Sequence, residues 1–367
     1  MRVPFFDYAA HFKEHEGEYV RIFREVMGRG AFILQREVEE FEQALAEFVG
    51  VKHAIAVADG TNAMLLGFRA LDLPAGGEVI MCSHTYVATA AAAHYAGLRP
   101  VPVEVSADRT IDCDSVEEHI SSRTCAIMPT QLNGRVADMD RLEHLCHRYD
   151  LVLVEDAAQA LGARYKGKAA GTFGAFGTYS FYPAKALGCF GDGGALVTDD
   201  DVVAVKVRRM RDHGRDDEGR FVMWGTNCRL DNLQAAILTF KLSRYPEIIN
   251  RRRMLARRYC DNLTDVNEIQ LPPGPDEPNR FDIYQNFEIE AERRDQLRRY
   301  LATKGIGTLV QWNGQPLHRL SALGLSRDLP RTETFFQKCL MLPLYPGLTD
   351  DQVDFVCEAI HEFYRSH

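Results

Sequence analysis

The chain has 367 residues, and its 46% hydrophobic and 26% charged content is ordinary for a globular protein that buries its own core. A net charge of −9 argues against a nucleic-acid partner, because an acidic surface repels the phosphate backbone. Nine scattered cysteines without a C-x-x-C pair argue against a disulfide framework or a zinc ribbon and are typical of a cytoplasmic protein.

Seven short apolar runs before Asp200 predict strands. Most are continuous rather than alternating, which is typical of strands buried on both faces of a parallel sheet. The runs are HAIAVAD (53–59), EVIMCS (78–83), RPVPVEV (99–105), TCAIMPTQ (124–131), LVLVEDA (151–157), TYSFY (178–182) and GALVTD (194–199). Stretches such as Thr61–Leu71 and Met139–Tyr149 are long enough for crossover helices. We therefore predict a mostly parallel α/β sheet.

A glycine and a hydroxyl follow the first predicted strand, in the run Asp59-Gly60-Thr61. Backbone N–H groups at a helix start can bind a phosphate together with a hydroxyl, so Gly60 and Thr61 are candidate phosphate ligands. The alternative is a plain capped helix, because Asp and Thr both cap well. Tyr86 follows the second predicted strand, where its ring could stack on a flat heterocycle or belong to the core.

Two carboxylates, Glu155 and Asp156, end the fifth predicted strand. The carboxyl ends of parallel strands are where α/β proteins bind ligands. A carboxylate there could keep a pyridine nitrogen protonated, as pyridoxal chemistry requires. The alternative is that Asp156 caps a following helix.

A single lysine, Lys185, follows the sixth predicted strand in a loop with glycines at positions 188, 191, 193 and 194. Such a loop lets the backbone approach a bound group closely. A lysine held there away from water would have a lowered pKa and could form an imine with an aldehyde. On this segment alone the alternative is a surface lysine beside a flexible turn, but the combination with Asp156 favours a pyridoxal site.

The pattern changes in the last third of the chain, which predicts a smaller α+β unit. The expected elements are one or two long helices over Asp231–Tyr259, a proline-rich break over Leu271–Asn279, a strand over Tyr284–Glu290 and a helix over Arg293–Gly305 that ends at its glycine. We place the domain boundary near residue 245, which gives a large domain of residues 1–245 and a small domain of residues 246–367.

Three other features are set aside. His144 and His147 could share a helix face with Cys146 nearby, but no further ligands adjoin them, so we expect no metal site. The basic stretch Arg251–Tyr259 is interpreted as a solvated helix face, with steering of an anionic nucleotide diphosphate as the alternative. The N-terminus has no signal-peptide core and no run reaches the roughly 20 apolar residues of a membrane span, so we expect no membrane partner.

Taken together, the motifs resemble the sugar aminotransferases of the DegT/DnrJ group, which are fold-type-I enzymes. The string from Glu155 to Ala195 carries the resemblance, with DGTNAM and HTYVA upstream and GTNCRLDNLQAA downstream. The resemblance is strong from Phe32 to Ala236 and weaker elsewhere. It implies a large domain with a mostly parallel seven-stranded sheet between helices, plus a smaller C-terminal α+β domain.

The resemblance also implies a role for each matching position. Lys185 would bind the cofactor, pyridoxal 5'-phosphate, covalently and then move a proton, and Asp156 would pair with the pyridine nitrogen. The other implied cofactor contacts are Gln159 near the ring hydroxyl, Tyr86 stacked on the ring, Gly60, Thr61 and Ser180 at the phosphate, and Asn227 from the neighbouring subunit. The role of Asn227 implies a homodimer with shared active sites.

The implied activity is transfer of an amino group, from L-glutamate, to a nucleotide-linked keto-sugar in deoxyamino-sugar and polysaccharide biosynthesis. Some relatives carry histidine in place of Lys185 and perform dehydration, so the lysine favours transamination. A dehydratase of the same fold is one alternative. The other is a non-catalytic pyridoxal-binding regulator, which the lack of a basic arm or helix-turn-helix extension disfavours.

The sugar pocket departs from the usual pattern of these relatives in the runs Gln131–Gly134 and Val310–Gly314. The loop FYPAKALGCFGDGG resembles members of the group that act on 3-keto nucleotide sugars more than those that act on 4-keto ones, which implies a 3-keto substrate. The candidate substrate residues are Phe32, Arg229, Trp312 and His318. For Arg229, whose fork of donors could bind a carboxylate or phosphate, a structural role at the interface is the alternative.

Overall fold

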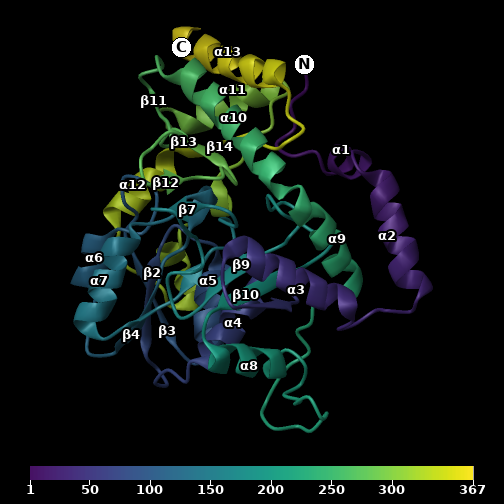
Figure 1. Ribbon diagram of the computed structural model, residues 1–367. Coiled ribbons are helices and arrows are strands. Elements are labelled where there is room, and N and C mark those ends of the chain that lie inside the picture. The colour runs from purple at the N-terminus through teal and green to yellow at the C-terminus, as the bar shows by residue number, and fades with distance from the viewer. Residues whose placement is uncertain (367) are drawn as a thin grey trace.

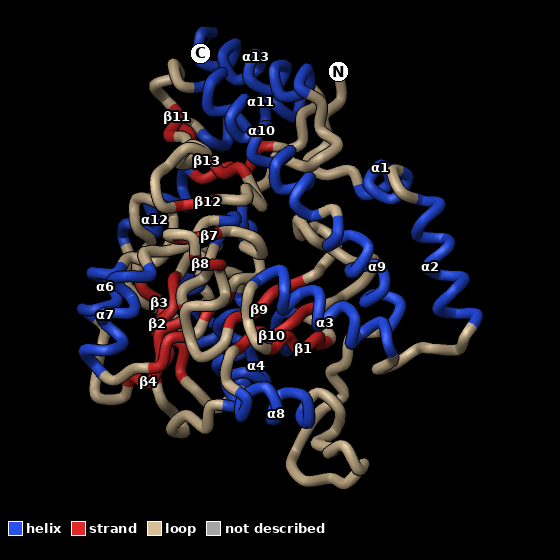
Figure 2. Tube along the Cα trace, viewed as in Figure 1, coloured by secondary structure: helices blue, strands red, loops and turns tan. Residues whose placement is uncertain are grey.

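The computed structural model describes residues 1–366 and contains a seven-stranded sheet with helices on both faces (Figures 1 and 2). Its strands are β1 (His53–Val57), β2 (Glu78–Cys82), β3 (Arg99–Val103), β4 (Thr124–Met128), β5 (Val152–Leu153), β6 (Glu155–Asp156), β9 (Gly177–Ser180) and β10 (Gly194–Thr198). Each of the seven predicted apolar runs contains a strand, with β5 and β6 sharing one run.

β5 and β6 are successive parts of one strand, because the ladder with β4 continues across the residue between them. The N–H of Val154 donates to Ile127 O (3.0 Å) and the N–H of Asp156 donates to Pro129 O (3.0 Å). The strand order is therefore β1-β10-β9-β6/β5-β4-β2-β3, and all neighbours are parallel except at β10, which is antiparallel to β1 and β9. The predicted mostly parallel seven-stranded sheet is confirmed.

The sheet strands are apolar throughout because both faces are covered. In β1, Ile55 packs in one core cluster and Ala54 and Ala56 pack in another on the opposite face. The helices over these two faces include α3 (Arg36–Val49) and α7 (Met139–Tyr149) on the alanine side, and α4 (Gly60–Ala70), α5 (Val87–Tyr95) and α8 (Asp201–Met210) on the isoleucine side. The crossover helix predicted over residues 139–149 has the observed bounds, and that over 61–71 begins and ends one residue earlier.

Further helices, among them those of the C-terminal unit, complete the fold. They are α1 (Tyr8–Lys13), α2 (Glu16–Gly28), α6 (Cys113–Glu118), α9 (Asn232–Ser243), α10 (Tyr245–Leu263), α11 (Arg294–Thr303), α12 (Pro330–Lys338), α13 (Asp350–Ser366) and the short η1 (Leu132–Gly134), η2 (Gln311–Gly314), η3 (Leu317–Arg319) and η4 (Ser321–Leu323). The long helical stretch predicted over 231–259 is thus two helices, α9 and α10. None of the helices in the described residues has the length and apolar character needed to cross a membrane.

A three-stranded antiparallel sheet forms the C-terminal unit with α10, α11 and α13 (Figure 1). Its order is β11-β13-β14, with bounds Ile269–Gln270, Phe287–Ala291 and Cys339–Leu342. The strand predicted over 284–290 begins three residues later, and α11 ends before Gly305, whose φ of +78° is unsuited to a helix. The N-terminal residues join this unit, since Val3 pairs with Ile306.

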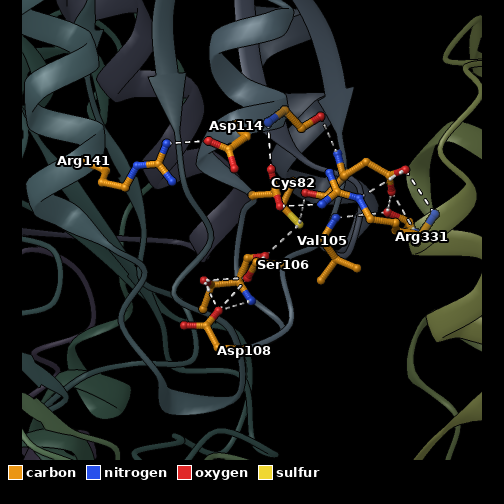
Figure 3. Close-up of polar contacts among 12 residues, drawn as sticks. Cys82, Val105, Ser106, Asp108, Asp114, Arg141 and Arg331 are labelled. Carbon is orange, nitrogen blue, oxygen red and sulfur yellow. Dashed lines mark hydrogen bonds and ion pairs between the residues drawn. The ribbon is translucent and has the colours of Figure 1, made fainter.

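The proposed boundary near residue 245 coincides with the start of α10 and stays a prediction. Contacts cross between the two parts of the chain in a second three-stranded ladder, β12-β7-β8 (Arg280–Phe281, Arg164–Tyr165, Lys168–Ala169). A further contact is made by α12, which lies against the end of β3. Arg331, labelled in Figure 3, donates to Asp112 (2.8 Å), and the N–H of Val105 donates to Thr332 Oγ1 (3.1 Å).

Candidate active site

A cavity of about 740 Å³ lies where the carboxyl ends of β1, β2, β4, β6 and β9 meet. Ligands bind at this edge of α/β sheets. Eight of the predicted site residues line it, namely Gly60, Thr61, Tyr86, Asp156, Gln159, Ser180, Lys185 and Trp312. The fold therefore brings together residues that are separated by up to about 250 positions in the chain.

Asp156 is a buried carboxylate held by two donors. Thr89 Oγ1 donates to its Oδ2 (2.7 Å), and the N–H of Ala158 donates to its Oδ1 (3.1 Å). Burial raises the pKa of Asp156, whereas these hydrogen bonds and the charge of Lys185 lower it. The proposed capping role of Asp156 is wrong, because the next described helix, α8, begins only at Asp201. Its carboxylate is left facing the cavity, where it can accept a hydrogen bond from a cationic ring nitrogen.

A chain of threonine hydroxyls orients the donor to Asp156. Thr130 Oγ1 donates to Thr85 Oγ1 (2.9 Å), which lies 2.8 Å from Thr89 Oγ1. Since Thr89 gives its hydrogen to Asp156, Thr85 is the donor in the middle link. This chain of hydrogen bonds could not be predicted from the sequence, because the three hydroxyls lie in separate segments, after β2, in α5 and after β4.

Lys185 lies in the loop after β9, with its amine in the cavity. Gln285 fixes this loop: its Oε1 accepts from the N–H of Ala186 (2.6 Å) and its Nε2 donates to Ala184 O (2.9 Å). Burial lowers the pKa of Lys185 to about 8, and the charge of Asp156 opposes that shift. Lys185 is half-buried and lines the cavity, so the surface-lysine alternative is wrong. A lysine with this pKa is neutral often enough at neutral pH to act as a nucleophile.

The start of α4 has the chemistry of an anion site. Asp59 caps the helix by accepting from the N–H of Asn62 (2.9 Å), while the N–H groups of Gly60 and Thr61 have no hydrogen-bond partner in the described chain. A Cβ on Gly60 would lie 3.0 Å from the Cβ of Ser180, so glycine allows a closer approach here than a larger residue would. Two free amides and the hydroxyls of Thr61 and Ser180 suit a phosphate.

An aromatic pair and a polar network complete the walls. Tyr86 is 57% exposed, so it does not belong to the hydrophobic core. Its ring centroid lies 5.2 Å from that of Trp312. Gln159 Oε1 accepts from the N–H of Asn133 (2.8 Å), and Asn133 Nδ2 donates to the buried Glu288 (2.9 Å). Residues of the C-terminal unit thus reach the cofactor-side residue Gln159, a connection that sequence spacing could not indicate.

Pyridoxal phosphate fits the groups present in this cavity. A buried carboxylate, an amine with a lowered pKa, an aromatic ring and a cradle of free N–H groups match its pyridine nitrogen, aldehyde, ring and phosphate respectively. The individual contacts with the cofactor stay predictions.

Four of the predicted residues do not line the cavity of this single chain, namely Phe32, Asn227, Arg229 and His318. Asn227 is exposed and accepts from Arg229 Nε (3.0 Å), and Arg229 also donates to Asp212 (2.9 Å). Phe32 is exposed as well. His318 is buried, with one ring nitrogen 2.7 Å from Ser83 Oγ and the other 3.2 Å from Glu333 Oε1. Their substrate and partner roles stay predictions.

Comparisons with known proteins agree with this geometry. The model of the DegT/DnrJ/EryC1/StrS aminotransferase family matches residues 13–361. The dTDP-3-amino-3,4,6-trideoxy-alpha-D-glucose transaminase of Streptomyces venezuelae is 39% identical over 99% of this chain and 96% of its own. The solved structure of S. venezuelae DesV has a TM-score of 0.94 at 39% identity, covering 99% of this chain and 98% of that one. That of ntda from Bacillus subtilis, with bound cofactor PMP, has a TM-score of 0.91 at 29% identity, covering 99% and 85%.

Proposed function

The chain belongs to the DegT/DnrJ/EryC1/StrS aminotransferase family, and on this premise we propose that it moves an amino group from L-glutamate to the 3-keto group of a nucleotide-linked sugar, with pyridoxal phosphate as its cofactor. The observation that carries the proposal is the cavity shared by Lys185 and Asp156. The 3-amino product in the name of the S. venezuelae relative supports the 3-keto assignment. Such a step belongs to deoxyamino-sugar biosynthesis.

The residues of this chain divide the work of holding the cofactor. Gly60, Thr61 and Ser180 would bind the phosphate, and Tyr86 would cover one face of the ring. Gln159 would contact the ring hydroxyl. When bound, pyridoxal phosphate supplies an aldehyde for the amino group and a ring that accepts electrons.

Asp156 would keep a proton on the ring nitrogen. Its two oxygens already accept from Thr89 and from the N–H of Ala158, so its position is fixed before the cofactor arrives. A cation beside this buried carboxylate would favour its ionised form, and the carboxylate would favour the protonated nitrogen in return. The threonine chain through Thr85 and Thr130 supports that arrangement.

Lys185 would move the proton between the amino-acid carbon and the cofactor. Its lowered pKa means that the amine can take up a proton and release it near neutral pH, as a general acid and base must. Gln285 holds the loop on both sides of Lys185, which keeps the amine in the cavity during this exchange.

We also propose a homodimer in which Asn227 of each subunit completes the partner's phosphate site. Asn227 is exposed and outside its own cavity, in a segment whose Trp224 and Phe221 are 95% and 73% exposed. Large apolar side chains at such exposure are typical of an interaction surface. Mixing Lys185→Ala with Asn227→Ala subunits tests this, since a hybrid dimer contains one native site and should recover roughly a quarter of the activity after random exchange. No recovery would contradict shared sites.

The cytoplasm is the compartment that we propose. All nine cysteines are free thiols, and free thiols persist in a reducing environment.

The direct test is an absorption spectrum of the purified protein with pyridoxal phosphate, before and after addition of glutamate. We expect a long-wavelength band that is lost as a keto acid appears, and that returns when the keto-sugar nucleotide is added. Lys185→Ala should show neither change. A band that is unaffected by every amino acid would contradict the aminotransferase assignment, and conversion of the sugar without keto-acid release would indicate a dehydratase.

A further inference from the structure

A second cavity, of about 490 Å³, lies on the side of Lys185 that faces the C-terminal unit. It shares Lys185, Gln159, Tyr182 and Trp312 with the first cavity, so the two spaces adjoin at these residues. Aliphatic side chains of the C-terminal unit, including Leu309, Met341 and Leu344, form much of its wall. A molecule that reacts at Lys185 can therefore extend in either direction.

Arg252 lines this second cavity and is 1% exposed. It lies in α10, inside the stretch that the sequence suggested was a solvated face, and for this residue that prediction is wrong. Its Nη1 donates to the carbonyl oxygens of Tyr284 (3.0 Å), Gln285 (3.2 Å) and Leu344 (3.2 Å). These three bonds fix the guanidinium by one nitrogen only.

The other edge of the Arg252 guanidinium has no partner. Nε is buried without a hydrogen bond, Nη2 donates to no described residue, and no described carboxylate lies within 4.0 Å. Arg109 and Arg135, two other buried arginines, differ in this respect, since each has an acidic neighbour, Glu290 at 3.7 Å and Asp282 at 2.7 Å. Burial lowers the pKa of Arg252 to about 10.

A buried charge without a counter-ion is unfavourable, so an anionic ligand at this edge of the guanidinium would stabilise Arg252. Nε has almost no exposed surface, so Nη2 is the unpartnered nitrogen that a carboxylate in the cavity can reach, and a hydrogen bond between a cation and a carboxylate is among the strong ones. Among the described residues that line the two cavities, Lys185 and Arg252 are the only Lys or Arg side chains. Since Lys185 is used at the cofactor, Arg252 is the remaining cation of this chain for an incoming acid.

We propose that Arg252 binds a carboxylate of the amino-acid donor in the second cavity. The inference rests on the proposed function, because a donor has to bring its amino group to Lys185 and carries a carboxylate close to that group. The phosphate cradle at Gly60 belongs to the first cavity, which leaves the second free for the donor. The α-carboxylate and the side-chain carboxylate of glutamate are the two possible sources of the bound group.

The test uses the full-length, cofactor-loaded protein and the variants Arg252→Lys and Arg252→Gln. Arg252→Lys keeps the buried charge and can still donate to the carbonyls, so it guards against loss of folding. Arg257→Gln is the matched control, because Arg257 lies on the same helix, is exposed and is paired with Asp276. The donor half-reaction is followed by the absorbance change at rising glutamate concentration, and the acceptor half-reaction by the KM for the keto-sugar nucleotide.

We expect both Arg252 variants to weaken glutamate binding about tenfold or more, as loss of a charged hydrogen-bond pair should, with the acceptor KM unchanged. Glutarate, which has both carboxylates but no amine, should bind the wild-type protein in calorimetry and bind Arg252→Gln at least about tenfold more weakly. If only glutamate is weakened and alanine is not, the side-chain carboxylate is bound; if both are weakened equally, it is the α-carboxylate.

The inference would be overturned if both variants bound glutamate and glutarate as tightly as the wild-type protein does. It would also be overturned if the variants lost donor and acceptor binding to the same extent, which is the result expected of an arginine with a purely structural role. These outcomes are distinct from failure of the proposed function, in which the wild-type protein itself converts no amino acid.

Discussion

The surroundings of Lys185 in the cavity predict how fast the protein takes up its cofactor as pH changes. Burial lowers the pKa of Lys185 from 10.5 to about 8. Only the neutral amine attacks an aldehyde, so at pH 7 about one molecule in ten is reactive, against about one in 3,000 for an ordinary lysine. The surroundings of Lys185 therefore raise the neutral, reactive fraction of the amine about 300-fold at pH 7.

The assay adds pyridoxal phosphate to cofactor-free protein and follows the long-wavelength band from pH 6 to 10. The rate should rise about tenfold for each pH unit and level off near pH 8. Asp156→Asn should move the midpoint lower, because the carboxylate stabilises the protonated amine. Lys241→Arg is the control, since burial also lowers the pKa of Lys241 to about 8 but this lysine lies outside the cavity. A rate that still rises beyond pH 10, or an upward shift in Asp156→Asn, would refute the reasoning.

Three further predictions concern the surroundings of the site. Thr89→Val removes a 2.7 Å donor to Asp156, which should weaken cofactor binding about tenfold or more in a titration without large loss of stability; unchanged affinity would contradict it. Gly60→Ala would bring a Cβ to 3.0 Å from Ser180 and should weaken cofactor binding about tenfold, and tight binding would show that no close approach is needed. Burial raises the pKa of Glu288 from 4.5 to about 7, so its contribution to stability should be lost as pH rises through 7. In urea unfolding, the free energy of unfolding should differ less between pH 5 and pH 8 for Glu288→Gln than for the wild-type protein, by about 3 kcal/mol at most. An equal difference in the two proteins would contradict this prediction.

Much of the fold could be predicted from the sequence because its strongest features are local. All seven apolar runs contain strands of the large sheet, and Met139–Tyr149 is a helix with the expected ends. The strand predicted over 284–290 begins late because Gln285 and Asn286 are used to hold the active-site loop and Asn133 rather than to pair in the sheet. Local periodicity contains no information about such tertiary contacts.

The site was predictable where its residues lie in one motif and not where they come from several segments. Asp156 ends one strand of a parallel pair and Lys185 lies in the loop after the other, so their meeting could be expected. The threonine chain to Asp156 could not be predicted, because threonines in loops and helices are common and these three have no distinctive spacing. Arg252 was assigned to a solvated face because neighbouring arginines suggested one, and only the packing of α10 reveals that it is buried.

The measurement that tests the central claim most directly is chemical identification of the lysine that binds the cofactor. The loaded protein is reduced with borohydride, which makes the link permanent, and the labelled peptide is identified by mass spectrometry. We predict a single label on Lys185, with none on Lys241 despite its similarly lowered pKa. A label on Lys241 or another lysine, or no label at all, would contradict the assignment of this cavity as the active site.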